Sequence, residues 1–311
     1  MTTALLSHAA CLDHVTPPGH PERVARLEAV LAALDAPEFA GLVRLEAPLA
    51  DVAEVLRVHP AAYLAQIKGA IPRAGQVMLD EDTHVSQGSL DAALRAVGAA
   101  TLAVDLVLAG RVRNAFCATR PPGHHAETAR AMGFCLFGTA AIAAKRALDH
   151  HGLNRVAVVD FDVHHGNGTQ DLLWDDGRAL FISLHQMPLY PGTGSSGERG
   201  AHDNVLNLPL PPGSGGAEMR RAVTKQVMPR LRAFAPELVL ISAGFDAHAD
   251  DPLANLAWHE DDFAWITSEL CELADQCAGG RVVSTLEGGY DLDALAASVA
   301  AHVRVLMERD G

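Results

Sequence analysis

One short segment of the chain concentrates residues that could bind a metal ion. Residues 158–168, VVDFDVHHGNG, join an apolar, β-branched run to Asp160, Asp162 and His164. Side chains two residues apart in an extended segment point to the same side. Asp162 and His164 are therefore predicted to reach one metal ion from one strand end. A catalytic zinc ion takes three protein ligands and leaves a fourth position for water, so a third ligand must come from elsewhere.

Asp246 is the candidate for this third ligand. It ends the segment 240–246, LISAGFD, in which a buried-looking strand runs into glycine and then a carboxylate. An aspartate there could instead cap the next helix. Its place at a strand end equivalent to that of Asp162 and His164 favours the ligand interpretation. Asp160 shares their side of the strand, and a role as the partner that orients a histidine is favoured over direct binding.

Two adjacent histidines, His124 and His125, lie in the segment RPPGHHA, 120–126. Histidines in loops are commonly exposed to solvent and have no function. Here proline and glycine fix the backbone path, and the loop follows another predicted strand at the same edge of the sheet. Because histidine exchanges protons near neutral pH, this pair is predicted to act in proton transfer.

Three aromatic residues complete the group of candidates. Tyr290 follows two glycines in LEGGY, 286–290, and could donate a hydroxyl proton at the site or cover an edge of the core. Phe134 in GFC, 133–135, and Tyr190 in LYPG, 189–192, could form the walls of a narrow apolar entrance. Packing in the core is the alternative for each of them.

These candidates need a sheet that brings several strand ends together. Apolar, β-rich runs are predicted as strands at Val112–Thr119, Arg155–Phe161, Ala179–His185, Asn204–Leu208, Leu238–Ala243 and Arg281–Leu286. Amphipathic stretches between them are predicted as helices at Pro21–Leu34, Ser89–Ala109, Gly138–His150, Ala217–Ala233, Glu260–Ala278 and Leu292–Glu308. This alternation indicates an α/β fold with a mainly parallel sheet, as one domain over residues 1–311. Ligands of such sheets bind beyond the carboxyl ends of the strands.

Composition narrows the class of protein. Of the 311 residues 49% are apolar and 20% charged, which is typical of a soluble globular domain. The net charge of −14 disfavours nucleic acid as a direct partner. Five cysteines without a CxxC pair are predicted to be reduced thiols. No run of residues has the length of a membrane span, and residues 1–8 do not have the features of a signal peptide, so a cytoplasmic protein is expected.

Together the motifs resemble those of the histone deacetylase and acetylpolyamine amidohydrolase superfamily, and in particular its bacterial, class II-like members. The resemblance rests on GHPER (19–23), RPPGHHA (120–126), GFC (133–135), DFDVHHGNGTQ (160–170), GFDAHADDPL (244–253) and LEGGY (286–290), in this order. It implies an open, mostly parallel eight-stranded sheet with helices on both faces, the arginase/deacetylase-like fold. It also implies hydrolysis of an acylated amine.

The resemblance assigns roles to individual residues. It implies zinc ligands at Asp162, His164 and Asp246, His125 as the proton acceptor, His124 as an electrostatic partner oriented by Asp160, and Tyr290 as the donor to the oxyanion. It implies a substrate tunnel at Gly133, Phe134 and Tyr190, with Leu253 and Asp82 at the rim, although a solvated acidic loop is an equal reading of Asp82. A structural potassium ion is implied at Asp160, Asp162, His164, Ser183 and Leu184, mostly through backbone carbonyls.

Two comparisons within these folds are informative. Asn167 stands where class I members carry a second orienting aspartate, so it is expected to orient His125 without adding negative charge. Ureohydrolases with a related fold bind two manganese ions, but this chain has Gly166 and His248 where the additional carboxylates would fall. The comparison therefore favours a site with one catalytic metal ion.

Three functions follow as hypotheses. The first is a zinc-dependent deacetylase that acts on Nε-acyl-lysine, which the apolar Leu253 at a gate position favours. The second is a deacetylase of acetylated polyamines or other small amines, and the third is a catalytically idle module that binds acyl-lysine. The sequence leaves open the physiological substrate, the acyl length, the oligomeric state and the metal used in the cell, since iron(II) or cobalt also suits two aspartates and a histidine.

Overall fold

The centre of the protein is a sheet of eight parallel strands. The computed structural model describes residues 2–309. The strands follow the order β2-β1-β5-β10-β9-β6-β7-β8, and every neighbouring pair is parallel. The strands are β1 Thr3–Ser7, β2 Val43–Glu46, β5 Asn114–Cys117, β6 Val156–Asp160, β7 Ala179–Gln186, β8 Val205–Leu210, β9 Leu238–Ala243 and β10 Val282–Leu286. A separate antiparallel pair is formed by β3 Gln76–Met78 and β4 His84–Ser86.

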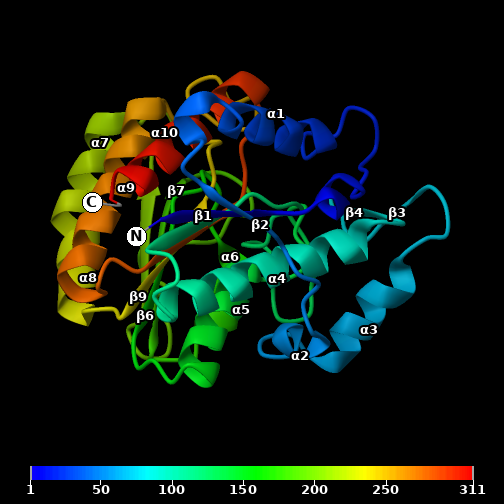
Figure 1. Cartoon of the computed structure of the whole chain (residues 1–311), viewed down its shortest axis with the longest axis horizontal. Helices are drawn as coiled ribbons and strands as arrows, with labels where there is room; N and C mark the ends of the chain where they lie inside the picture. Colours follow the sequence, from blue (N-terminus) through cyan, green and yellow to red (C-terminus); the bar gives the residue numbers. More distant parts are fainter. Residues whose placement is uncertain (1, 310–311) are drawn as a thin grey trace.

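Helices cover both faces of this sheet (Figure 1). The helices are α1 Val24–Leu34, α2 Val52–Val55, α3 Ala61–Ala70, α4 Ser89–Leu108, α5 Thr139–Lys145, α6 Asn167–Leu173, α7 Gly216–Ala222, α8 Met228–Phe234, α9 Glu260–Cys277 and α10 Leu292–Glu308. Alternate residues of β6 supply the two cores between sheet and helices. Val156 and Val158 pack in one core, which includes residues of α4 and α5, and Ala157 and Val159 pack in the other, with residues of α1, α9 and α10.

The predicted fold class and the parallel sheet are confirmed. The six predicted strands form β5 to β10 with ends within two residues, and five of the six predicted helical segments are found with ends within three residues. The remaining segment, Gly138–His150, is α5, which ends at Lys145 and is followed by a π-helical turn over Arg146–His150. The predicted helix Ala217–Ala233 is divided by a π-helical turn at Val223–Val227 into α7 and α8. The sequence patterns did not predict β2 at one edge of the sheet, its neighbour β1, the pair β3–β4, or α2, α3 and α6.

Strand order explains how the candidate residues come together. β5, β10, β9 and β6 are neighbours at the centre of the sheet. Each of these strands is followed by a segment with candidate residues: His124 and His125 after β5, Tyr290 after β10, Asp246 after β9, and Asp162 and His164 after β6. Since all four strands run in the same direction, their carboxyl ends form one edge of the sheet. Among the described residues, no helix is both long enough and apolar enough to cross a membrane.

Candidate active site and metal centre

The three predicted metal ligands lie together in the interior. One ligand atom from each of Asp162, His164 and Asp246 lies within 4.8 Å of the other two, and all three residues are buried. The Nδ1 atom of His164 is 3.1 Å from Asp162 Oδ1 and 3.1 Å from Asp246 Oδ2. Two carboxylates and one imidazole are a ligand set suited to zinc and to similar divalent ions.

The prediction that Asp162 and His164 extend from a strand is wrong in its local geometry. β6 ends at Asp160, and both residues lie in the loop that follows. Side chains in this loop bind its own backbone: the N–H of Asp162 donates to Asp160 Oδ1 at 3.1 Å, and that of His164 donates to Asp162 Oδ1 at 2.9 Å. Such aspartate turns compete with continuation of a strand. They still direct the two side chains to one point.

Two glycines allow the carboxylates to approach the backbone. The N–H of Gly288 donates to Asp162 Oδ2 at 2.8 Å. A Cβ atom at Gly288 would lie 2.2 Å from Asp246 Oδ2, and one at Gly244 would lie 2.0 Å from Asp162 Oδ2. Either side chain would displace a carboxylate, so glycine is required at both positions for steric reasons.

The electrostatics of this cluster favour a positive charge between the carboxylates. Burial alone would lower the pKa of His164, but its hydrogen bonds to Asp162 and Asp246 raise it to about 10. Burial alone would raise the pKa of Asp162, but His124 and His164 hold it well below its usual range. Since a metal cation can occupy the place of such a proton, the residues present fit a bound divalent ion.

His124 and His125 lie beside this cluster in opposite protonation states. The Nδ1 of His124 is 3.0 Å from Asp160 Oδ2. Burial would lower the pKa of His124, but Asp162 and Asp160 raise it well above its usual value. Burial and the neighbouring His124 and His164 lower the pKa of His125 well below its usual value. His124 is therefore a cation, and His125 is a neutral imidazole that can accept a proton.

Asn167 orients His125, as predicted for its position. The Oδ1 atom of Asn167 lies 2.7 Å from His125 Nδ1. The Nδ2 group of Asn167 donates to Glu127 Oε1 at 2.8 Å, which fixes the orientation of the amide. His125 therefore donates its Nδ1 proton to Asn167 and keeps Nε2 as the acceptor. Glu127, two residues after His125 in the chain, was not predicted to take part.

Tyr290 reaches the same cavity from the loop after β10. Burial raises the pKa of its hydroxyl well above the usual value, although Arg26 opposes this shift. The Arg26 guanidinium lies over the tyrosine ring at 4.8 Å, and its Nε donates to the carbonyl of Gly289 at 2.5 Å. The backbone N–H of Tyr290 donates to Asp251 Oδ2 at 2.7 Å. Tyr290 is thus held as a neutral donor.

The cavity above these residues is narrow and mostly apolar. It has a volume of about 250 Å³ and is lined by Asp82, His125, Gly133, Phe134, His164, Leu189, Tyr190, Leu253 and Tyr290. Every residue predicted for the tunnel is among them. Asp82 also shapes the wall, because its Oδ1 accepts from the N–H of Gly133 at 3.1 Å. Phe134 has a φ of 68° and its N–H binds Thr83 Oγ1 at 3.0 Å.

Two buried acids support the site and were not predicted. Glu287 accepts hydrogen bonds from the N–H groups of Gly123 at 2.7 Å and His124 at 3.1 Å. These bonds connect the loop that carries His124 and His125, here called the histidine loop, to the residue that follows β10. Glu22 binds the Arg120 guanidinium through both carboxylate oxygens, at 2.5 and 2.7 Å. Glu287 stands in the motif LEGGY and Glu22 in the motif GHPER, both of which carry the family resemblance. The sequence alone did not indicate which groups these two carboxylates would bind.

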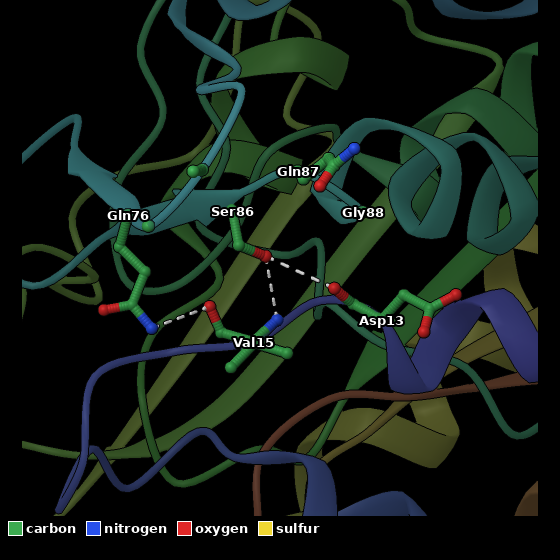
Figure 2. Close-up of a pocket in the computed structure, with 8 residues that line it drawn as sticks. Asp13, Val15, Gln76, Ser86, Gln87 and Gly88 are labelled. Carbon is green, nitrogen blue, oxygen red and sulfur yellow. Dashed lines mark hydrogen bonds between the residues drawn. The ribbon is translucent and has the colours of Figure 1, made fainter.

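A larger hollow in the surface contains none of the predicted site residues. It has a volume of about 550 Å³ and lies between the N-terminal segment and the β3–β4 pair (Figure 2). Two of its polar side chains bind the backbone of Val15: Ser86 Oγ accepts from the N–H of Val15 at 2.9 Å, and Gln76 Nε2 donates to the carbonyl of Val15 at 3.3 Å. It therefore lacks the group of reactive side chains found in the smaller cavity.

The sheet and its edge define the class of protein. A central parallel sheet carries two carboxylates and an imidazole that could hold a metal ion, with a second imidazole and a tyrosine around one narrow cavity, an arrangement that suits a hydrolase. Residues 20–306 match the model of the histone deacetylase domain. The chain belongs to the histone deacetylase family, whose members are deacetylases and amidohydrolases.

Relatives from several kingdoms agree with this membership. The chain is 42% identical to a histone deacetylase-like amidohydrolase of Pseudomonas aeruginosa, over 89% of this chain and 74% of that protein. It is 38% identical to a probable deacetylase of Archaeoglobus fulgidus, over 94% and 82% of the two chains. The crystal structure of the HDA15 HD domain superposes with a TM-score of 0.94 at 34% identity, over 99% of this chain and 88% of the other. The eight-stranded fold expected from the resemblance is confirmed.

Proposed function

We propose that the protein is a zinc-dependent amidohydrolase that removes acetyl or other acyl groups from Nε-acyl-lysine or a related acylated amine. One observation carries this proposal. A neutral imidazole, His125, a metal-ligand candidate, His164, and a protonated phenol, Tyr290, all line one narrow and largely apolar cavity. An acylated amine fits this lining because its amide is uncharged and its alkyl stem is apolar.

Asp162, His164 and Asp246 would hold the zinc ion. When bound, the ion would polarise the amide carbonyl of the substrate and lower the pKa of water. The proposed site has one catalytic metal ion. His248, which stands where the related ureohydrolases carry an additional carboxylate, is not among the three grouped ligands.

The remaining chemistry belongs to the side chains around this cluster. His125 Nε2 takes a proton as water attacks the amide carbon, and later delivers it to the departing amine. His124 stays protonated and stabilises the negative charge that develops next to it, with Asp160 fixing its orientation. The Tyr290 hydroxyl donates to the oxygen that becomes an anion.

A structural potassium ion next to this site is part of the proposal. Its support is the register of the sheet, which pairs Asp160 of β6 with Ser183 of β7 and places Leu184 next along the strand. Asp162 and His164 follow in the adjoining loop. A cytoplasmic location remains a prediction from the sequence.

The choice of substrate can be tested by comparing two acylated amines. We expect the zinc-loaded protein to hydrolyse an acetyl-lysine peptide with a higher kcat/KM than acetylputrescine. The reason is that Leu253, which is 36% exposed at the cavity, places an apolar side chain and not a carboxylate at the gate position that would meet the free ammonium group of acetylputrescine. Release of free amine is the measurement. A strong preference for acetylputrescine would support the polyamine deacetylase instead, and binding of both without turnover would support the idle module.

The Asn167→Asp variant is expected to shift the acidic limb of the pH–rate profile to higher pH. His125 must be neutral to accept a proton, so activity falls as the pH drops through its pKa. A carboxylate in place of the Asn167 amide would favour the protonated imidazole and raise that pKa. The measurement is kcat/KM as a function of pH.

Glu127 supplies the control for this variant. An aspartate at position 167 would face the Glu127 carboxylate, which now accepts from the Asn167 amide. Combining Asn167→Asp with Glu127→Gln removes this repulsion and should keep the shifted profile, whereas Glu127→Gln alone should leave the acidic limb near its original position. An acidic limb that does not move in the double variant would show that Asn167 does not set the pKa of His125.

A further inference from the structure

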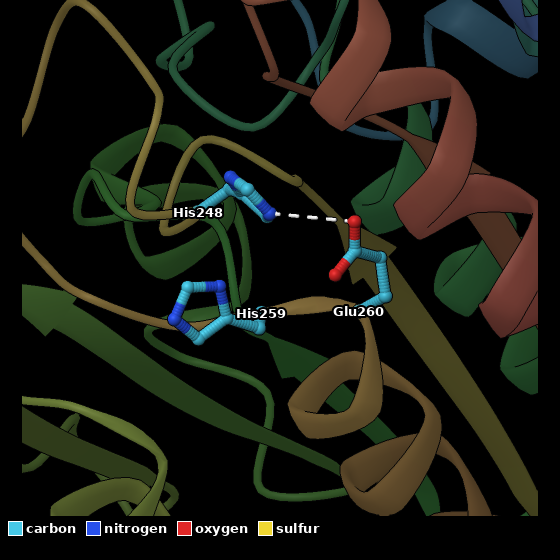
Figure 3. Close-up of side chains that lie close together, drawn as sticks. All are labelled: His248, His259 and Glu260. Atoms are coloured by element: carbon cyan, nitrogen blue, oxygen red, sulfur yellow. Dashed lines mark ion pairs between the residues drawn. The ribbon is translucent and has the colours of Figure 1, made fainter.

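A second group of side chains that could bind a metal ion lies outside the candidate active site. It consists of His248, in the loop after β9, with His259 and Glu260 at the start of α9. One ligand atom from each lies within 4.8 Å of the other two. Figure 3 shows the His248 ring directed at the Glu260 carboxylate, with the His259 ring beside it. The rings of the two histidines are 5.5 Å apart and almost perpendicular.

His248 supplies the observation that points to a ligand. The residue is only 4% exposed, yet its Nε2 atom has no hydrogen-bond partner within residues 2–309. The nearest charged atom, Oε1 of Glu260, is 3.7 Å away, which is too long for a hydrogen bond. Buried polar atoms are nearly always paired in native proteins. This imidazole nitrogen is buried, unpaired and directed at a carboxylate, so it is available as a metal ligand once its proton moves to Nδ1.

The backbone holds His248 against the start of α9. The N–H of Ala249 donates to the carbonyl of Trp258 at 2.9 Å, and the N–H of Trp258 donates to the carbonyl of Ala247 at 3.1 Å. These bonds form a parallel bridge between His248 and Trp258, the residue before His259. The spacing between the buried ligand and the helix is therefore fixed without a metal ion.

Charge around the group also favours a cation. The first turn of α9 carries Glu260, Asp261 and Asp262. These carboxylates oppose the positive end of the helix dipole, which would otherwise disfavour a metal ion at this position. Asp250 adds a fourth carboxylate, with its Oδ2 atom 3.8 Å from His248 Nδ1.

We propose that His248, His259 and Glu260 form a second site for zinc or a similar divalent transition-metal ion, separate from the catalytic cluster. Two imidazoles and one carboxylate are a common ligand set for zinc, with water in the fourth position. The ion would join the loop after β9, which also carries Asp246, to the N-terminus of α9. This site does not depend on the proposed deacetylase activity.

Binding requires small movements of two surface side chains, together with a change of tautomer at His248. Tetrahedral bonds of about 2.0–2.1 Å place ligand atoms about 3.4 Å apart, closer than the present limit of 4.8 Å. His259 is exposed and the Glu260 side chain is 43% exposed, so both can rotate inward. His248, the buried member, keeps its position.

The proton on His248 must change nitrogen when the ion binds. The Nδ1 atom now accepts from the N–H of Asp250 at 3.1 Å, which leaves the proton of a neutral ring on Nε2. Coordination through Nε2 moves that proton to Nδ1, with no net proton released by the ring, and Nδ1 then no longer accepts from the N–H of Asp250. The Asp250 carboxylate can then accept it, in the arrangement by which carboxylates orient metal-bound histidines.

Counting bound zinc in the full chain tests this site. The protein is stripped with a chelator and dialysed against Zn²⁺, and bound metal is measured by mass spectrometry. We expect two equivalents for the unmodified protein and one each for His259→Ala and Glu260→Gln. Asp246→Asn should also bind one, and its combination with His259→Ala none. His150→Ala, which removes an exposed histidine outside the group, should still bind two.

Three results would reject the second site. If the unmodified protein binds one equivalent of zinc and Asp246→Asn binds none, the catalytic cluster is the only zinc site. This result would not affect the deacetylase proposal. Two equivalents that persist in both His259→Ala and Glu260→Gln would place the second ion elsewhere. Loss of an equivalent in His150→Ala would show non-specific binding to surface histidines. Absence of deacetylase activity in the unmodified protein with two equivalents of zinc bound would instead count against the proposed function and not against the second site.

Discussion

Replacement of Tyr290 with phenylalanine is expected to lower kcat for an acetyl-lysine peptide by about 100- to 1000-fold, with little change in KM. The change removes one hydroxyl from the cavity and leaves the ring that packs against Phe134, at 5.8 Å, and beneath Arg26. Burial keeps the hydroxyl protonated over the working pH range because it raises the pKa. The lost interaction therefore concerns the transition state, in which the carbonyl oxygen gains negative charge.

Tyr190→Phe is the matched control for this experiment. Tyr190 lines the same cavity and its ring is 5.2 Å from that of His125, but it is 39% exposed. Loss of its hydroxyl should change kcat much less than loss of the Tyr290 hydroxyl. Equal kcat for the two variants and the unmodified protein, with zinc bound in all three, would remove Tyr290 from the proposed mechanism.

His125→Ala is expected to reduce kcat by about 10²- to 10⁴-fold, the range for loss of a general base. His125 is the neutral member of the histidine pair, and its Nε2 atom is not used by Asn167. The variant should also lose the acidic limb of the pH–rate profile, because that limb reports protonation of the missing imidazole. Steady-state rates and zinc content are measured together across the pH range.

Zinc content separates this role from a structural one. His125 is not one of the grouped metal ligands, so His125→Ala should bind as much zinc at the catalytic cluster as the unmodified protein. Asp162→Asn should instead lose both zinc and activity. A fully active His125→Ala variant whose acidic limb is intact would show that another group accepts the proton.

The sequence predicted six of the eight strands of the sheet and missed β1 and β2, which lie together at one side of it. β9, with Leu238-Val239-Leu240-Ile241, is buried on both faces and stands out as a continuous apolar run. β2 is four residues long and only partly buried, so its short pattern has little periodicity. β1, at the start of the chain, is defined by its pairing with β5, more than 100 residues away. Such long-range pairing cannot be read from local propensity.

The site residues were recognised because each stands in a continuous sequence motif. The residues that hold them in place by hydrogen bonds come from distant parts of the sequence and were not recognised. His124 and His125 stand in one segment with the sharp Pro-Gly path that identifies it. The link from Asn167 to Glu127 joins residues 40 apart, and Glu287 binds the histidine loop from 164 residues away. Partners at such distances become visible only when the strand order is known. The same holds for His248, whose neighbours follow 11 and 12 residues later but whose unpaired nitrogen requires coordinates.

The position of β10 in the sheet has a consequence for the synthesis of the protein. This strand is the last to leave the ribosome, yet it lies between β5 and β9 at the centre of the sheet. Until residues 282–286 emerge, β2-β1-β5 and β9-β6-β7-β8 have no strand to join them. The nascent chain can thus pair its two halves separately while their inner edges remain open, and such edges are prone to wrong pairing. Closure of the sheet and completion of the candidate active site then occur in one event, after the other seven strands have been translated.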